Sequence, residues 1–131
     1  MNKIIACLFL PLTILTSTAY AADFDAGLVA YKKNDYATAI QEWRPLANQG
    51  DVDAQLSLGA MYENGRGMPQ DEKEAVRWYR LAAAQGNAPS QFNLGLMYAN
   101  GRGVLQDDKE AVKWLRLAAV QGGPMRSTTS G

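Results

Sequence analysis

The chain has 131 residues, with 13 basic and 13 acidic side chains, no histidine and a single cysteine, Cys7. That length suits one small domain, and the balanced charge offers no field that would attract nucleic acid. Without histidine the chain lacks the commonest general base and a principal metal ligand, so the composition disfavours catalysis and transition-metal binding, and no cofactor is expected.

The first 21 residues have the pattern of a secretory signal peptide. Lys3 supplies a positive charge, residues 4–15 carry no charge, and residues 19–21 (Ala-Tyr-Ala) fit a small-x-small cleavage site. Twelve apolar residues are short for a membrane-spanning helix. Cleavage before Ala22 would leave a mature protein without cysteine, and therefore without a disulfide of its own. We expect a periplasmic or secreted bacterial protein with no stable membrane span after cleavage.

A divergent helical hairpin is predicted over residues 24–50. Its first helix is expected at about residues 24–33, and Asn34-Asp35 joins it to the second. The pair Gln49-Gly50 lies 36 residues before an identical pair, which relates this segment to the repeats that follow. Terminal repeats are commonly atypical, because one side of them faces water.

Two close copies of one unit follow. Residues 55–86 recur at residues 91–122, shifted by 36 positions, with 22 of 32 residues identical. Self-similarity at this period indicates stacked supersecondary units. The expected fold is all-α, a short α-α solenoid of three helical hairpins at residues 24–50, 51–86 and 87–122, before a disordered tail at residues 123–131.

Each copy reads as two helices joined by a turn. Gly65 closes the first helix, and Asp71 with Glu74 has the spacing of a capping box at the start of the second. Trp78 and its counterpart Trp114 are expected to be core residues. The glycines inside the first helices, Gly59 and Gly95, indicate close approach of the partner helix.

Four sequence strings carry a family resemblance: Leu-Gly, Tyr-x-Asn-Gly-x-Gly, Lys-Glu-Ala-x-x-Trp and Ala-Ala-x-Gln-Gly. Over about residues 37–122 they resemble the Sel-1-like repeat (SLR) family, a branch of the tetratricopeptide-repeat (TPR-like) superfamily. The resemblance implies an α-solenoid whose first helices line a concave surface, and a scaffold or adaptor role in holding proteins together. Some exported relatives are cysteine-rich and reported to bind penicillin, so a β-lactam-binding or hydrolysing envelope enzyme is the alternative. This chain departs from those relatives completely in cysteine content.

The two Gly-Arg-Gly segments lack the sequence context of a phosphate loop. No strand precedes Gly65-Arg66-Gly67 or Gly101-Arg102-Gly103, and no Lys-Ser/Thr pair follows them. We interpret each as a helix-ending turn with a solvated arginine. Arg66 and Arg102 should lie on one edge of the stack, which gives them a secondary role in holding an acidic partner.

The candidate partner-binding surface comes from positions at which the two copies differ. In each first helix these positions are spaced i, i+4 and i+7, so they form one stripe. The stripe consists of Leu56, Ala60 and Glu63 in one copy and of Phe92, Leu96 and Ala99 in the other. A stripe that varies while the scaffold agrees favours a surface for a protein or peptide partner. The alternative is that Phe92 and Leu96 fill an inter-repeat contact.

The pattern stops after Gln121-Gly122. Residues 123–131 do not carry the residues of a further first helix, so we expect the last hairpin to lack a covering neighbour. Such an end should self-associate or fray from residue 107 onward. A self-associating structural protein of the envelope is therefore a third functional class.

Overall fold

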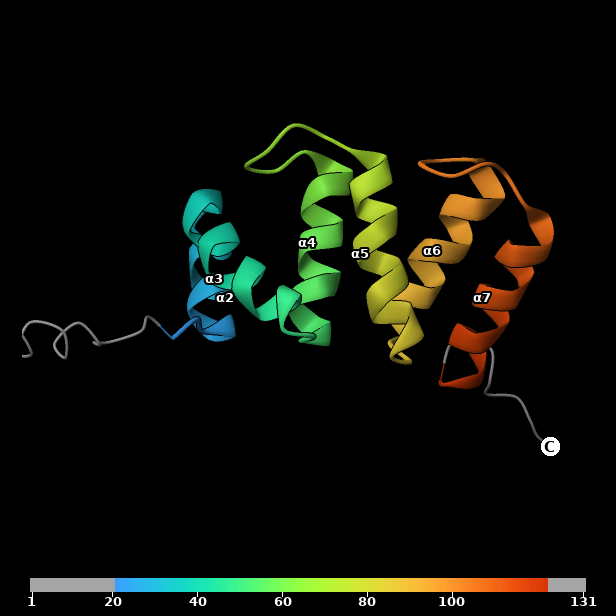
Figure 1. Cartoon of the computed structure of the whole chain (residues 1–131), viewed down its shortest axis with the longest axis horizontal. Coiled ribbons are helices and arrows are strands. Elements are labelled where there is room, and N and C mark those ends of the chain that lie inside the picture. The colour runs from blue at the N-terminus through green and yellow to red at the C-terminus, as the bar shows by residue number, and fades with distance from the viewer. Residues whose placement is uncertain (1–20, 123–131) are drawn as a thin grey trace, which may run out of the picture.

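The computed structural model describes residues 21–122, so the predicted leader, apart from its last residue, and the predicted tail at 123–131 lie outside the described residues (Figure 1). Within this range every regular element is an α-helix. The elements are α2 Phe24–Lys32, α3 Tyr36–Asn48, α4 Val52–Asn64, α5 Glu72–Ala84, α6 Ala88–Asn100 and α7 Asp108–Val120.

The helices pack in chain order as three hairpins. Helix α2 packs on α3, α4 on α5, and α6 on α7, while α3·α4 and α5·α6 join neighbouring hairpins. Figure 1 shows the resulting row, with α2 and α3 at one end and α7 at the other. The all-α solenoid of hairpins is confirmed.

Each described helix begins after an Asp or Asn whose side chain accepts backbone N–H groups. Asp71 accepts from the backbone nitrogens of Lys73 and Glu74, both at 3.1 Å. The predicted capping box is only half formed. The Asp71 backbone N–H donates to the carbonyl of Tyr62 at 2.9 Å, and Glu74 pairs with Arg77 instead. The loop returns alongside Tyr62, so its carbonyl takes the donor that Glu74 would have reached.

Glycine permits the close approach of the two helices in each repeated unit. A Cβ atom on Gly59 would lie 2.6 Å from the ring of Tyr79, and one on Gly95 would lie 2.7 Å from Cγ of Leu115. No side chain fits at these distances, so the predicted close contact is confirmed. Gly65 ends α4 with φ of 66°, in the left-handed region that glycine favours.

The core lies mainly between hairpins. One cluster of buried residues joins α2 and α3 to α4 and includes Trp78 of α5, and a second joins α5 to α6. Trp78 is 2% exposed. Trp114 packs against the second cluster but is only half-buried. The two positions match in sequence, and they differ because a further hairpin follows α5 but none in the described range follows α7.

Candidate interaction surface

Buried glutamines connect each hairpin to the one before it. The Nε2 of Gln55 in α4 donates to the carbonyl of Ala47 in α3 at 3.1 Å. Thirty-six residues later, Gln91 in α6 donates to the carbonyl of Ala83 in α5 at the same distance. Both glutamines are buried, so each bond satisfies polar groups that water does not reach. These two bonds define how a first helix docks on the preceding second helix.

A tyrosine seven residues after each glutamine makes a second polar contact to the preceding hairpin. Arg80 of α5 donates from Nη2 to the hydroxyl of Tyr98 in α6 at 2.6 Å. Arg44 of α3 makes the corresponding, longer contact to Tyr62 in α4 at 3.4 Å. The docking of one hairpin on the next therefore combines an apolar core with two recurring polar bonds.

Arg102 is held in an ion-pair network rather than being solvated. Its Nη1 lies 3.1 Å from Oε2 of Glu63, and its Nη2 lies 2.8 Å from Oε2 of Glu72. The hydrogen bond to Glu72 is the largest cause of a raised pKa for Arg102, so the guanidinium stays charged. Tyr79 donates to the other oxygen of Glu63 at 2.7 Å, and burial with this bond raises the pKa of Tyr79.

Arg66 likewise makes an inter-repeat contact. Its Nη1 donates to the hydroxyl of Tyr31 at 2.8 Å, and the guanidinium lies over the rings of Tyr31 and Tyr36, 5.7 and 5.9 Å from their centres. Arg66 remains exposed while it makes these contacts, as expected for a solvated arginine, whereas Arg102 is half-buried and held by two carboxylates. Each Gly-Arg-Gly loop folds back over the preceding hairpin, as shown by Gly103, where an added Cβ would collide with the backbone of Glu72.

The structure separates the two halves of the predicted stripe. Leu56 packs against the second core cluster, and Glu63 is bound by Arg102 and Tyr79. Ala60 is half-buried. Leu56 and Glu63 therefore make inter-repeat contacts. In α6, by contrast, Phe92 is 50% exposed and Leu96 is 37% exposed; Ala99 is half-buried. The stripe is open where no described hairpin follows.

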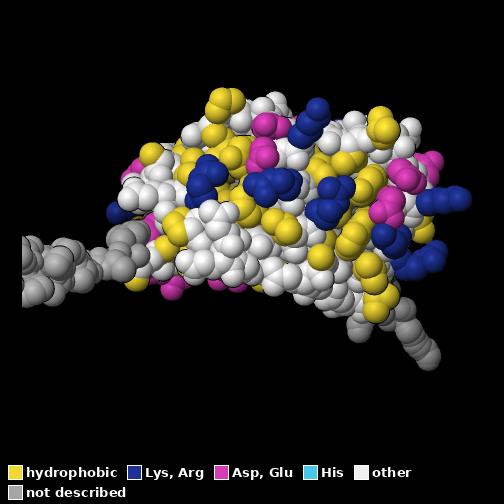
Figure 2. Space-filling view, in the orientation of Figure 1, with side chains coloured by type: hydrophobic (Ala, Val, Ile, Leu, Met, Phe, Trp, Pro, Cys, Tyr) yellow, Lys and Arg dark blue, Asp and Glu magenta, His cyan; other side chains and the backbone are white. Residues whose placement is uncertain are grey.

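The same opening extends onto α7. Val112 is 48% exposed, whereas Val76, its counterpart in α5, is 2% exposed because α6 and the loop at Gly103 cover it. A shallow hollow of about 590 Å³ lies along this helix. It is lined by Lys109, Val112, Lys113, Arg116, Leu117 and Val120. Figure 2 shows hydrophobic and basic side chains together at the end of the molecule that carries α7.

Sequence reasoning missed Val112 and Arg116, because both copies of the unit share valine at the first position and arginine at the second. Identity between copies was interpreted as scaffold. The signal that could have identified them is position in the stack, since a residue that is core in an inner hairpin becomes surface in the last one.

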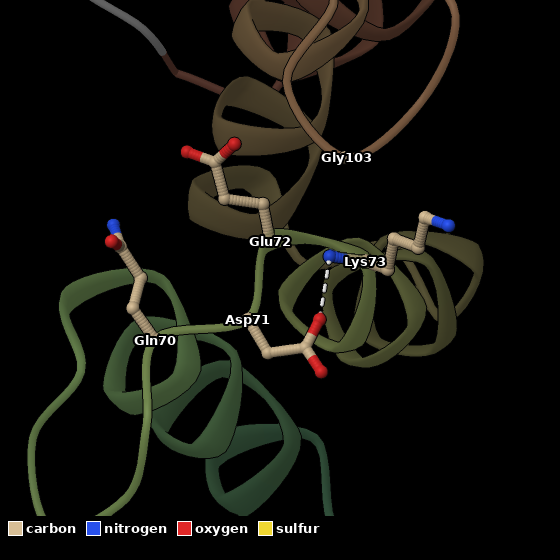
Figure 3. A pocket seen from close by; sticks show the side chains of 5 residues that line it. All are labelled: Gln70, Asp71, Glu72, Lys73 and Gly103. Carbon is tan, nitrogen blue, oxygen red and sulfur yellow. Dashed lines mark hydrogen bonds between the residues drawn. The ribbon is translucent and has the colours of Figure 1, made fainter.

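A second hollow, of about 500 Å³, lies where α5 begins, beside Gly103 (Figure 3). Both of its carboxylates have structural tasks. Asp71 caps the helix through the backbone of Lys73, and Glu72 pairs with Arg102.

In residues 21–122 no three or more Cys, Asp or Glu side chains gather as metal ligands. Nor does any helix in that range have the length and hydrophobicity of a membrane span.

The family model described as Sel1 repeat matches residues 52–87 and 88–123, together more than half of the chain. The chain belongs to the Sel1 repeat family. The two matches coincide with the α4–α5 and α6–α7 hairpins, and the divergent α2–α3 hairpin lies outside them. A comparison with curated proteins finds no match.

Solved structures agree with this assignment. A Sel1 repeat protein from Oxalobacter formigenes is similar at a TM-score of 0.72 and 38% identity, over 76% of this chain and 41% of that protein. A protective antigen of uropathogenic Escherichia coli with an SLR fold, c5321, gives 0.72 and 43% over 76% of this chain and 22% of that one. Helicobacter pylori cysteine rich protein B is similar at a TM-score of 0.66 and 25% identity, over 75% of this chain and 74% of that protein. The chain thus spans less than half of the first two proteins.

Proposed function

We propose that this Sel1 repeat chain is an exported, non-enzymatic interaction module that binds a protein partner on the first-helix side of its solenoid. The observation that carries the proposal is the exposure of Phe92 and Leu96, 50% and 37%, one helical turn apart on α6. Exposed apolar pairs on a rigid helix are typical anchors for a partner protein. The counterpart Leu56 is partly covered by the next hairpin, so of the two repeated first helices α4 and α6 it is α6 that offers this pair.

Export is supported by the charge and hydrophobicity pattern of residues 1–21. The description of the E. coli relative as a protective antigen fits a protein presented outside the cytoplasm. Intact-mass analysis of the protein from its native host should show a chain that begins near Ala22. A population that begins only at Met1 would contradict export.

Partner binding is tested by crosslinking and capture from the native periplasm or culture medium. Phe92→Ala should reduce capture of the crosslinked partner at least tenfold. Val29→Ala is the matched control, because Val29 is 52% exposed but lies on α2, at the other end of the stack. Equal loss with both variants, or no loss with Phe92→Ala, would contradict the proposed surface. Turnover of a β-lactam by the same preparation would contradict the non-enzymatic assignment.

A further inference from the structure

Helix α7 retains the groups that α5 uses to bind α6. On α5 these are the apolar contact of Val76, the Ala83 carbonyl that accepts Gln91, and Arg80, which donates to Tyr98. The corresponding positions of α7, each 36 residues later, are Val112, Ala119 and Arg116. The first helices α4 and α6, which dock on α3 and α5, therefore show which kind of helix this set of groups binds.

We propose that the open side of α7 binds the first helix of a Sel1-type repeat carried by a different protein. The occupant is an amphipathic helix with a glutamine and a tyrosine seven residues apart, as Gln91 and Tyr98 are in α6. Its glutamine would donate to the Ala119 carbonyl, and its tyrosine would accept from Arg116. Its apolar face would cover Val112, as α6 covers Val76. This inference identifies the partner class of the proposed function and rests on it.

A second copy of this chain does not offer such a helix at its free end. Gly27 of α2 lies against the ring of Trp43 as Gly59 of α4 lies against Tyr79, which aligns the two helices. In this alignment Asp23, Ala30 and Asn34 stand at the positions of Gln55, Tyr62 and Arg66. Helix α2 thus lacks all three polar side chains with which a hairpin docks on the preceding one.

Charge also disfavours two copies of α7 lying face to face. The hollow is bordered by Lys109 and Arg116, both exposed, and by Lys113, which pairs with Glu110. Pairing α7 with itself would bring these basic groups together in a partly desolvated contact. A first helix like α6, whose residues 88–100 carry no charged side chain, avoids this repulsion.

The probe is a synthetic peptide with the sequence of residues 87–103, labelled for fluorescence anisotropy. A hydrocarbon staple between positions 92 and 96 keeps it helical, since an isolated helix of this length is marginal in water. Those two positions are exposed in α6, so the staple leaves the docking residues unchanged. The peptide is titrated with the whole chain and with three variants.

Saturable binding is expected, weakened at least tenfold by Val112→Asp and at least threefold by Arg116→Gln. Leu105→Asn is the matched control and should change the affinity by less than twofold. Leu105 is 89% exposed in the loop before α7 and does not line the hollow. Its counterpart Pro69 stays exposed although α6 follows α5, so a following helix does not cover this position. Circular dichroism of each variant establishes that it is folded, and Arg116→Gln provides the test if Val112→Asp is not.

Absence of saturable binding, or binding that Val112→Asp and Arg116→Gln leave unchanged, would overturn this inference. Concentration-dependent dimers in light scattering that Val112→Asp abolishes would also overturn it, because the occupant would then be a second copy. The peptide assay does not use the native partner. A failed capture experiment with Phe92→Ala therefore contradicts the proposed function and leaves the peptide result to stand separately.

Discussion

Residues at matching positions of the two copies should contribute differently to the free energy of unfolding, because the two hairpins bury them to different extents. Trp78 and Trp114 stand at matching positions of the two copies, yet Trp78 is 2% exposed and Trp114 is half-buried. Sequence analysis predicted both as core from their spacing and size. The difference agrees with the expectation that the last hairpin lacks a covering neighbour, an expectation that had not been applied to Trp114.

Trp78→Ala should therefore destabilise the chain more than Trp114→Ala. Removing a fully buried tryptophan costs about 3–5 kcal/mol, which is a large part of the stability of so small a repeat array. Trp114→Ala should cost less than half as much. Urea unfolding followed by circular dichroism measures both. Equal losses for the two variants would show that Trp114 is as well packed as Trp78.

Tyr79 should make the stability depend on alkaline pH. Burial and the bond to Glu63 raise its pKa above the ordinary value of 10.0. In the unfolded chain Tyr79 ionises near pH 10, whereas in the folded chain it stays protonated. The contribution of Tyr79 to stability is therefore fully present below pH 10. Above that pH the unfolded chain loses a proton that the folded chain keeps, so the free energy of unfolding falls as the pH rises.

The comparison is with Tyr79→Phe, which cannot ionise. The variant should be less stable at neutral pH, because Glu63 loses a hydrogen bond, but its stability should fall less steeply between pH 10 and 11. Every other tyrosine is present in both chains, so the difference between the two slopes isolates Tyr79. Parallel slopes would contradict a raised pKa for this hydroxyl.

The helices themselves were predictable from local signals. The period of apolar residues placed α4 and α5, and Gly65 and Asp71 marked where one ends and the other begins. The contacts of Arg102 were not predictable in the same way. Its partners Glu72 and Glu63 lie 30 and 39 residues away, and only the stacking of hairpins brings them together. The exposure of the candidate site was equally hard to predict from local sequence, because it depends on whether a further hairpin packs beside α6 and α7.

The glutamine contacts between hairpins give a test of how neighbouring elements are coupled. Gln91→Leu would keep much of the apolar volume of the side chain but would remove one of the two donors to the Ala83 carbonyl, which would keep only its bond from the Gly86 N–H. Gln121, which donates to Oε1 of Gln91 at 2.9 Å, would lose its acceptor as well. We expect a loss of about 1–3 kcal/mol in the free energy of unfolding.

Gln41→Leu is the control for this substitution, because Gln41 is exposed on α3 and should tolerate leucine with little change. Chemical denaturation of both variants, compared with the unchanged chain, measures the effect. If the Gln91→Leu chain is as stable as the control, the inter-hairpin glutamine stabilises the stack by side-chain packing and not by its hydrogen bonds.

At the level of the whole stack, stability should fall toward the end that carries α7. In a repeat protein each unit is stabilised mainly by its neighbours, so a unit with one neighbour opens more easily than a unit with two. The α4–α5 hairpin packs against α3 on one side and against α6 on the other. In the described range helix α7 is covered only by α6. Val112 and Phe92 remain exposed as a result.

Hydrogen exchange should therefore show weaker protection of the amides in residues 108–120 than in residues 72–84. The matched comparison is a chain with one additional copy of residues 87–122 inserted after residue 122, which gives α7 a following hairpin. In that chain the protection of residues 108–120 should rise to the level of α5, and the exchange of the new last helix should become the fast one. If α7 is already as well protected as α5 in the unmodified chain, its open side does not weaken it, and a covering contact outside residues 21–122 must be sought.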